Sequence, residues 1–299
     1  MDVRELHRRA VAGFGDRVRG VPAGAWRWPT PCEGWDVREL VAHVVEECRW
    51  TPPLLAGATV EEVGDRFAGD LLGDDPVAAW SAAGDEAVAA SQGVEPAVTV
   101  HLSFGDFPAE EYLFQLAADH LVHAWDLARA TGQDEALDPD VVAAVADWFV
   151  DREPFYREGG VIGPAVEVAE EAGPQAVLVG RFGRDPAPGG TLAAVARFNL
   201  AFAAGDLAGI AAAVADDAVF VDTTPPDGGR HEGPDAIVAA FRGVFASPGC
   251  EFSTEEGFVA GDRAVFLWRY GWQGGHVRGV DVFRVRDGLV VEKLSYVKG

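Results

Sequence analysis

Two residues in the middle of the chain have the types and spacing needed to bind a metal ion. Asp119 and His123 lie four residues apart in an apolar segment, 111–130, that contains no glycine or proline. Its leucines and alanines recur at three- and four-residue steps, which predicts a helix. Residues four apart on a helix project from the same face, one turn apart. The pair can therefore ligate one divalent cation, although a simple Asp–His hydrogen bond has the same spacing.

A metal site of this kind needs a third ligand from elsewhere, and His43 is the candidate. It lies in a second apolar segment with helical spacing, residues 40–45. Two imidazoles and one carboxylate leave at least one coordination position open on zinc, which is the catalytic pattern. The same donor set suits iron, nickel or manganese, so the ligands alone do not name the metal.

The neighbours of this pair have two interpretations each. Asp126 follows His123 by three residues and can accept a hydrogen bond from its imidazole, or can lie on the surface as a partner of Arg129. His120 is turned about 100° away from Asp119 by helix geometry. It is expected to be a core residue with a hydrogen bond to another helix, with substrate contact as the alternative.

A second candidate for chemistry, Asp281, lies near the C-terminal end of the sequence. Strand alternation places it on a face that Trp268 and Tyr270 are expected to share. A carboxylate in an apolar pocket suits general acid or base catalysis. The alternative is a buried structural acceptor. Asp222 and His231 are weaker candidates for the same pocket.

Helical segments account for the first part of the chain. Several segments with helical apolar spacing, separated by loops, predict an all-α unit with an antiparallel four-helix core, in which facing helices can form a metal site. The loop at 21–35, rich in proline and tryptophan, is expected to pack Trp26, Trp28 and Trp35 over the end of this bundle. The predicted helices are 2–19, 36–49, 74–92, 108–131 and 138–155.

The pattern changes after a Pro/Gly-rich break at 185–190. Two helices precede a strand, a helix and several strand-like runs, and Asp287-Gly288 is a hairpin signal. This order predicts an α+β domain. The expected domains are a helical bundle at 1–186, a linker at 187–190 and an α+β domain at 191–299. The second domain's predicted helices are 191–204, 206–215 and 234–245, and its strands 218–223, 250–259, 263–273, 276–285 and 289–297.

Size and charge limit the classes of function. The 299 residues suit about two domains. A formal net charge of -24 argues against nucleic acid and against anionic membranes as partners. The three cysteines, Cys32, Cys48 and Cys250, are too few for a disulfide framework. Neither a signal peptide nor an apolar run of about 20 residues is found, so a cytoplasmic location is expected.

Three motifs carry a resemblance to a known family. They are TPCEGWDVRELVAH at 30–43, DHLVHAWDLARATG at 119–132 and GRDP at 183–186. With them, residues 2–186 resemble the actinobacterial branch of the DinB-like superfamily, which includes mycothiol-dependent maleylpyruvate isomerase. The resemblance implies a four-helix bundle with one divalent metal, usually zinc, at His43, Asp119 and His123. Asp119 stands where the isomerase has Glu, so its oxygen is drawn back by the length of a methylene.

The C-terminal part resembles a second family. The carrying residues are HEGPDAI at 231–237 and RGVDVFRVRDGLVVEK at 278–293. They are similar to SnoaL-like domains, which share a cone-shaped α+β fold with ketosteroid isomerases and polyketide cyclases. Because that fold hosts many functions, it implies an architecture more than an activity.

Together these observations predict a metal-dependent enzyme that acts on an electrophilic small molecule. By analogy with the isomerase, mycothiol is the expected co-substrate and isomerisation or S-transfer the expected reaction. The C-terminal domain is expected to bind ligand or to form a homodimer. Two alternatives remain open. In one, the SnoaL-like domain is an acid/base isomerase, cyclase or hydrolase and the bundle is accessory; in the other, the protein binds a small molecule without catalysis.

Overall fold

The computed structural model describes residues 1–187, 190–223, 228–245 and 251–298. Two predicted features, Cys250 and the linker positions 188–189, lie outside the described residues. The Cα positions group into two compact units. The first contains Met1–Gly20, Arg38–Leu127 and Glu135–Pro186, and the second contains Val21–Val37, Ala128–Asp134 and Ala187–Gly299.

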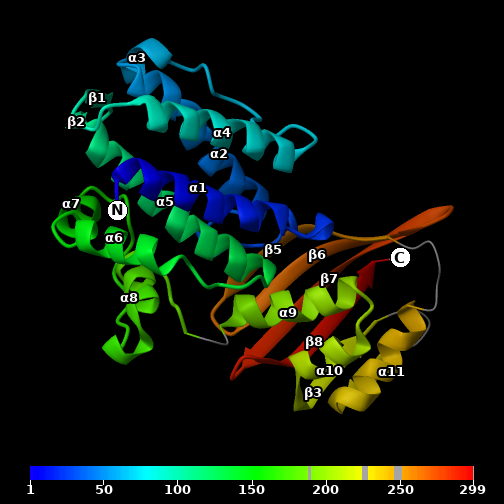
Figure 1. Ribbon diagram of the computed structural model, residues 1–299. Coiled ribbons are helices and arrows are strands. Elements are labelled where there is room, and N and C mark those ends of the chain that lie inside the picture. The colour runs from blue at the N-terminus through cyan, green and yellow to red at the C-terminus, as the bar shows by residue number, and fades with distance from the viewer. Residues whose placement is uncertain (188–189, 224–227, 246–250, 299) are drawn as a thin grey trace. The chain divides into compact units, whose positions relative to one another are not determined.

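The first unit is helical, and short polar side chains start several of its helices (Figure 1). Asp2 accepts a hydrogen bond from the Arg4 backbone N–H, and Asp75 accepts one from Ala78. These N-caps satisfy backbone donors that have no partner within the helix. The helices are α1 (Val3–Arg19), α2 (Val37–Leu55), α3 (Val60–Val63), α4 (Pro76–Gly93), α5 (Ala109–Thr131), α6 (Pro139–Phe149), α7 (Glu153–Glu158) and α8 (Pro174–Arg181).

Short elements complete the description of this part of the chain. A two-stranded hairpin joins α4 to α5 and is formed by β1 (Thr99–Leu102) and β2 (Gly105–Pro108). Two 3₁₀ helices, η1 (Ala23–Ala25) and η2 (Glu170–Ala172), lie in the connections. In the described part of the chain, no helix is both long and apolar enough to cross a membrane.

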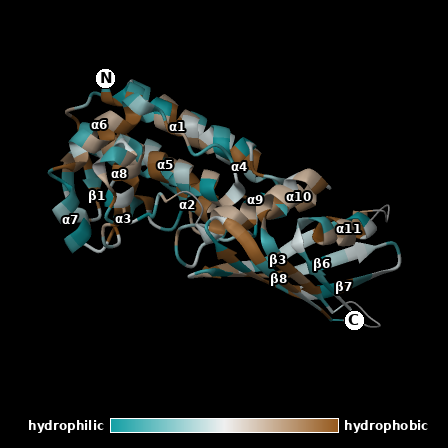
Figure 2. Cartoon of the chain, turned by 90° about the horizontal axis from the view of Figure 1, so that it is seen from below, coloured by the Kyte–Doolittle hydropathy of each residue, from teal (hydrophilic) through white to brown (hydrophobic). Residues whose placement is uncertain are grey.

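Buried side chains on several helices form the core of the first unit. Leu6 of α1, Leu113 of α5 and Phe149 of α6 all belong to it. Polar contacts also join helix pairs inside the core. His7 of α1 lies 3.0 Å from Ser91 of α4, which pairs two otherwise costly buried polar groups. Figure 2 shows helices that carry both hydrophobic and hydrophilic residues, as expected where one face is buried.

A six-stranded sheet with three helices forms the main body of the second unit. The strand order is β4-β3-β8-β7-β6-β5, and among the described strands the β3–β8 pair alone is parallel. The turn between β7 and β8 uses left-handed backbone at Asp287 (φ 52°) and Gly288 (φ 75°), which suits a tight hairpin. The elements are α9 (Thr191–Ala203), α10 (Leu207–Ala213), β3 (Val214–Asp222), β4 (Gly229–Glu232), α11 (Gly233–Phe245), β5 (Glu251–Ala260), β6 (Arg263–Trp272), β7 (Gly275–Arg286) and β8 (Leu289–Lys298).

Three sequence-based predictions of local structure were wrong. The second helix does not end near residue 49 but continues to Leu55, because Ala56 and Ala58 donate to the carbonyls of Pro52 and Pro53 and so maintain the last turn. The predicted helix at 138–155 is two helices, α6 and α7. The tryptophan loop was misplaced as well: Trp28 donates its indole N–H to the hydroxyl of Thr254 in β5, 3.2 Å away, within the second unit.

Candidate metal site

The structure brings together the three residues that the sequence suggested as metal ligands. His43 comes from α2, and Asp119 and His123 come from neighbouring turns of α5. Asp119 Oδ1 lies 3.6 Å from His43 Nε2 and 3.3 Å from His123 Nε2. One ligand atom from each of the three residues can be chosen so that all lie within 4.8 Å of one another. A single cation can therefore contact all three.

The donor set fits a divalent cation, and one atom makes the case stronger. Asp119 Oδ2 is buried and has no hydrogen-bond partner among the described residues. A buried carboxylate oxygen without a partner is costly, and a bound cation would remove that cost. Two imidazole nitrogens and a carboxylate suit zinc or another transition metal. The His43 side chain is 29% exposed, so this ligand lies where small molecules can reach it.

The imidazoles also determine the charge of the carboxylate. Burial raises the pKa of Asp119, but His123 and then His43 outweigh it by charge and hydrogen bonding and hold that pKa well below its usual range. Burial likewise opposes protonation of His43, but its hydrogen bond and charge interaction with Asp119 leave its pKa raised. At neutral pH the site therefore offers an anionic oxygen, which is what a cation requires.

Asp126 lies behind His123, away from the other two ligands. Its Oδ2 is 2.9 Å from His123 Nδ1, and the residue is completely buried, so of its two interpretations the contact with the His123 imidazole is present and the surface position beside Arg129 is wrong. Arg184 donates to both oxygens of Asp126. Burial would raise the pKa of Asp126, but the charge of Arg184 and the contact with His123 lower it to about 2. Asp126 is thus a carboxylate that orients the imidazole.

The sequence reasoning missed Glu47, which lies one helical turn after His43. Burial and the negative charge of Asp119 raise the pKa of Glu47 to about 7. The four-residue spacing from His43 would have indicated this position, since both residues project from one face of α2. A carboxylate with a pKa near neutrality beside a metal site is a candidate for proton transfer.

His120, by contrast, is a core residue. Its Nδ1 lies 2.6 Å from the Leu116 carbonyl and its Nε2 lies 3.3 Å from Cys48 Sγ on α2. This agrees with the predicted hydrogen bond to another helix. Burial also raises the pKa of the Cys48 thiol, so it remains protonated and unreactive.

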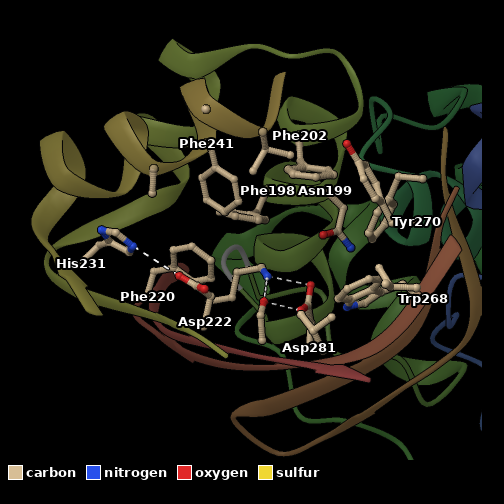
Figure 3. A pocket seen from close by; sticks show the side chains of 18 of the residues that line it. Phe198, Asn199, Phe202, Phe220, Asp222, His231, Phe241, Trp268, Tyr270 and Asp281 are labelled. Atoms are coloured by element: carbon tan, nitrogen blue, oxygen red, sulfur yellow. Dashed lines mark hydrogen bonds and ion pairs between the residues drawn. The ribbon is translucent and has the colours of Figure 1, made fainter. Parts of the chain in front are cut away.

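The second unit contains a separate cavity of about 680 Å³. Its wall is largely aromatic, and Figure 3 shows Phe198, Phe202 and Phe241 around the space with Trp268 and Tyr270 beside it. The helices α9 and α11 and the strands β6, β7 and β8 all contribute lining residues. A cavity of this size with a few polar groups is typical of a small-molecule site.

Asp281 lies on the wall of this cavity, with Trp268 and Tyr270 among the other lining residues. It is 7% exposed, and its Oδ2 is 2.7 Å from Lys293 Nζ. Ser295 donates a hydrogen bond to its other oxygen. The carboxylate is therefore engaged in an ion pair rather than isolated in an apolar pocket.

Lys293 is the second residue that the sequence reasoning missed. Its Nζ also lies 5.0 Å from the ring centre of Phe220 and 5.3 Å from that of Phe283, which allows cation–π attraction. Strand alternation would have given a signal, because Lys293 has the same parity as the buried Val291 and Ser295. The weaker candidates Asp222 and His231 lie 3.4 Å apart and line the same cavity.

Comparison with known proteins identifies two family matches. Residues 7–128 match the family described as mycothiol maleylpyruvate isomerase N-terminal domain. Residues 195–293 match the family described as SnoaL-like domain. The first match contains all three candidate metal ligands, and the second contains Asp281 and Lys293.

Individual proteins are similar over parts of the chain. Uncharacterized proteins from two strains of Mycobacterium tuberculosis, CDC 1551 and H37Rv, are each 34% identical over 148 residues, covering 47% of this chain and 74% of the relative. The crystal structure of an NTF2-like protein of unknown function from Mesorhizobium loti is 44% identical, covering 36% of this chain and 91% of that one, with a TM-score of 0.34. The chain thus belongs to the family of the mycothiol maleylpyruvate isomerase N-terminal domain, to which a SnoaL-like domain is joined in the same polypeptide.

Proposed function

We propose that the protein is a divalent-metal-dependent enzyme that uses a low-molecular-weight thiol to attack an electrophilic small molecule. Zinc is the first choice of metal and mycothiol the first choice of thiol. The observation that carries the proposal is the convergence of His43, Asp119 and His123 around a buried carboxylate oxygen that lacks a hydrogen-bond partner. The reaction class that follows is isomerisation or S-transfer.

The residues divide the work of such a site. Two imidazoles and the Asp119 carboxylate would hold the cation, and His43 is open enough to admit a co-substrate. A bound divalent cation supplies Lewis acidity that keeps a coordinated thiol deprotonated at neutral pH. Asp126 holds a proton on His123 Nδ1, which leaves Nε2 available as a ligand. Glu47 can accept a proton beside the site.

An external thiol suits the site better than the chain's own Cys48. Cys48 has no exposed surface, so no substrate can reach its sulfur. Burial also favours its protonated form, which is not nucleophilic. A small thiol that enters beside His43 avoids both obstacles.

Metal analysis of the purified protein is the direct test. We expect one divalent ion per chain by inductively coupled plasma mass spectrometry, and its loss in His43→Ala and in His123→Ala. His276→Ala is the matched control, because His276 is exposed on β7. Wild-type protein reconstituted with zinc should then convert maleylpyruvate or another electrophile when mycothiol is present; the thiol is recovered if the reaction is isomerisation and is consumed if it is S-transfer. Protein that binds no divalent metal after reconstitution would contradict the proposal.

The cavity of the second unit supports a second candidate function. A polar group of Asp281, Lys293 and Ser295 on an aromatic wall suits an acid/base isomerase, cyclase or hydrolase, or ligand binding without turnover. The two candidates are separable. If the cavity does the chemistry, Asp281→Asn abolishes turnover while His43→Ala retains it. A ligand that binds without being converted would favour a binding role.

The same reasoning gives an arrangement for the whole chain. We propose a helical domain within 1–186, of which Val21–Val37 and Ala128–Asp134 group with the second unit, and a SnoaL-like domain at 191–299, with dimerisation through the latter. Limited proteolysis should cleave first between them, within 187–190. Sedimentation equilibrium of the full chain should give twice the 31.7 kDa of one chain.

A further inference from the structure

We propose that Arg184 is a positioning residue for the candidate metal site and acts on His123 through Asp126. The inference rests on the proposed metal-binding function and assigns roles to Gly183 and Arg184 of the GRDP motif at 183–186. Arg184 follows Asp126 by 58 residues, so nothing in the local sequence connects the two.

The contacts form an unbroken line from the guanidinium to the ligands. Arg184 Nε donates to Asp126 Oδ1 at 3.1 Å, and Nη2 donates to Oδ2 at 2.8 Å. The same Oδ2 lies 2.9 Å from His123 Nδ1. His123 Nε2 in turn lies 3.3 Å from Asp119 Oδ1. Each group thus fixes the next one in the line.

The contact of Arg184 with both oxygens of Asp126 explains how it can orient His123. A guanidinium that binds both carboxylate oxygens sets the plane of that carboxylate as well as its position. Because Asp126 accepts from Nδ1, the His123 proton stays on that nitrogen and the Nε2 lone pair stays directed at the cation site. Without Arg184, Asp126 would lose its cation and its fixed plane, and the imidazole would lose its fixed tautomer.

The end of α8 explains how Arg184 reaches this position. Gly183 has a φ of +83°, which suits glycine, and an added Cβ would lie 3.1 Å from the Pro164 carbonyl oxygen. Arg184 donates its backbone N–H to the Val179 carbonyl, which closes the helix with a left-handed turn. Arg184 Nη1 also donates to the Phe182 carbonyl at 2.9 Å, which holds the side chain on its path toward Asp126.

A neighbouring ion pair supplies a matched control. Arg181 lies three residues before Arg184, and its Nε donates to Glu153 Oε2 at 2.8 Å. Its side chain is 26% exposed, against 17% for Arg184. Among the described residues, none of the contacts given for Arg181 or Glu153 leads to a candidate metal ligand. Arg181→Ala therefore removes a comparable ion pair from the same segment without touching the line to His123.

The first measurement is zinc affinity, by competition with a chromophoric chelator. We expect Arg184→Ala to bind zinc about 10- to 100-fold more weakly than wild type, the usual effect of losing an outer partner of a ligand. Arg184→Lys should fall in between, because an ammonium cannot make the two-point contact. Arg181→Ala should match wild type. Added guanidinium chloride at low millimolar concentration should restore part of the affinity of Arg184→Ala and none of that of Asp126→Ala.

The second measurement reads the tautomer of His123 without metal. Two-bond ¹H–¹⁵N spectra of histidine-labelled protein, recorded at a pH high enough to keep the imidazole neutral, should show the proton on Nδ1 in wild type and in Arg181→Ala, and a mixture in Arg184→Ala. Should Arg184→Ala fail to fold by circular dichroism, Arg184→Lys decides by the same two measurements. If wild type binds no zinc, the proposed function is refuted, and the tautomer measurement alone then tests whether Arg184 acts on His123. If wild type binds zinc and both Arg184 variants have the same zinc affinity and the same His123 tautomer as wild type, the inference about Arg184 is overturned while the proposed function stands.

Discussion

The buried ion pair between Lys293 and Asp281 makes a strong prediction about the stability of the SnoaL-like domain. Each residue is 7% exposed, and Nζ lies 2.7 Å from Oδ2. At an effective dielectric constant of about 20, two unit charges at that distance attract by about 6 kcal/mol. Desolvation of both groups offsets much of this, so the pair itself contributes little net stability.

Removing only one partner has a different outcome. Lys293→Met leaves Asp281 buried, and among the described residues the hydroxyl of Ser295 is then its one remaining hydrogen-bond partner. We expect a loss of about 3–5 kcal/mol in the free energy of unfolding. In Lys293→Met/Asp281→Asn the charge is gone and the amide oxygen can still accept from Ser295. This double variant should lie within about 2 kcal/mol of wild type.

Equilibrium urea unfolding of the full chain, followed by far- and near-ultraviolet circular dichroism, measures these differences. Lys298→Met is the control, because Lys298 is the other lysine of the sequence and is exposed on the same strand. It should change the free energy by less than about 0.5 kcal/mol. A loss below about 1 kcal/mol in Lys293→Met, or a double variant no more stable than the single one, would refute the reasoning.

Three further predictions concern pH, the cavity and the metal. The pKa of Glu47 is raised from 4.5 to about 7 in the folded chain, so the metal-free protein loses stability as the pH rises between those values. At 1.36 kcal/mol per pKa unit, the loss is at most about 3 kcal/mol. Urea titrations at pH 5 and pH 8 should show this loss in wild type and not in Glu47→Gln. Gly279→Ala would place a Cβ too close to the Trp268 ring and the Tyr296 carbonyl. The substitution should lower the free energy of unfolding by about 1–3 kcal/mol and weaken binding of an apolar fluorescent dye in the cavity. Unchanged dye binding would count against the packing described. Zinc at about 100 times its dissociation constant should stabilise the helical domain by about 2.7 kcal/mol in thermal unfolding, and a chelator should reverse this gain. If His43→Ala shows the same gain, His43 is not a ligand of the metal.

Much of the local structure could be predicted from the sequence. The uninterrupted apolar spacing at 111–130 predicted a helix, and α5 (Ala109–Thr131) contains it. The same spacing placed Asp119 and His123 on one face, where they lie 3.3 Å apart. Alternation predicted the four last strands, and Asp287-Gly288 predicted the turn before β8. These features depend on residues within a few positions of one another, so a local pattern is sufficient to specify them.

The partners of these residues were decided by tertiary structure. Periodicity placed Asp281 on an inner face, but the neighbouring strand supplied Lys293, which changed an isolated carboxylate into an ion pair. Likewise the spacing of Asp126 left two interpretations open until Arg184, 58 residues away, was found against it. A local pattern fixes which face a side chain occupies. The packing of distant segments decides which charges that face meets, and in a buried environment those charges determine what the residue can do.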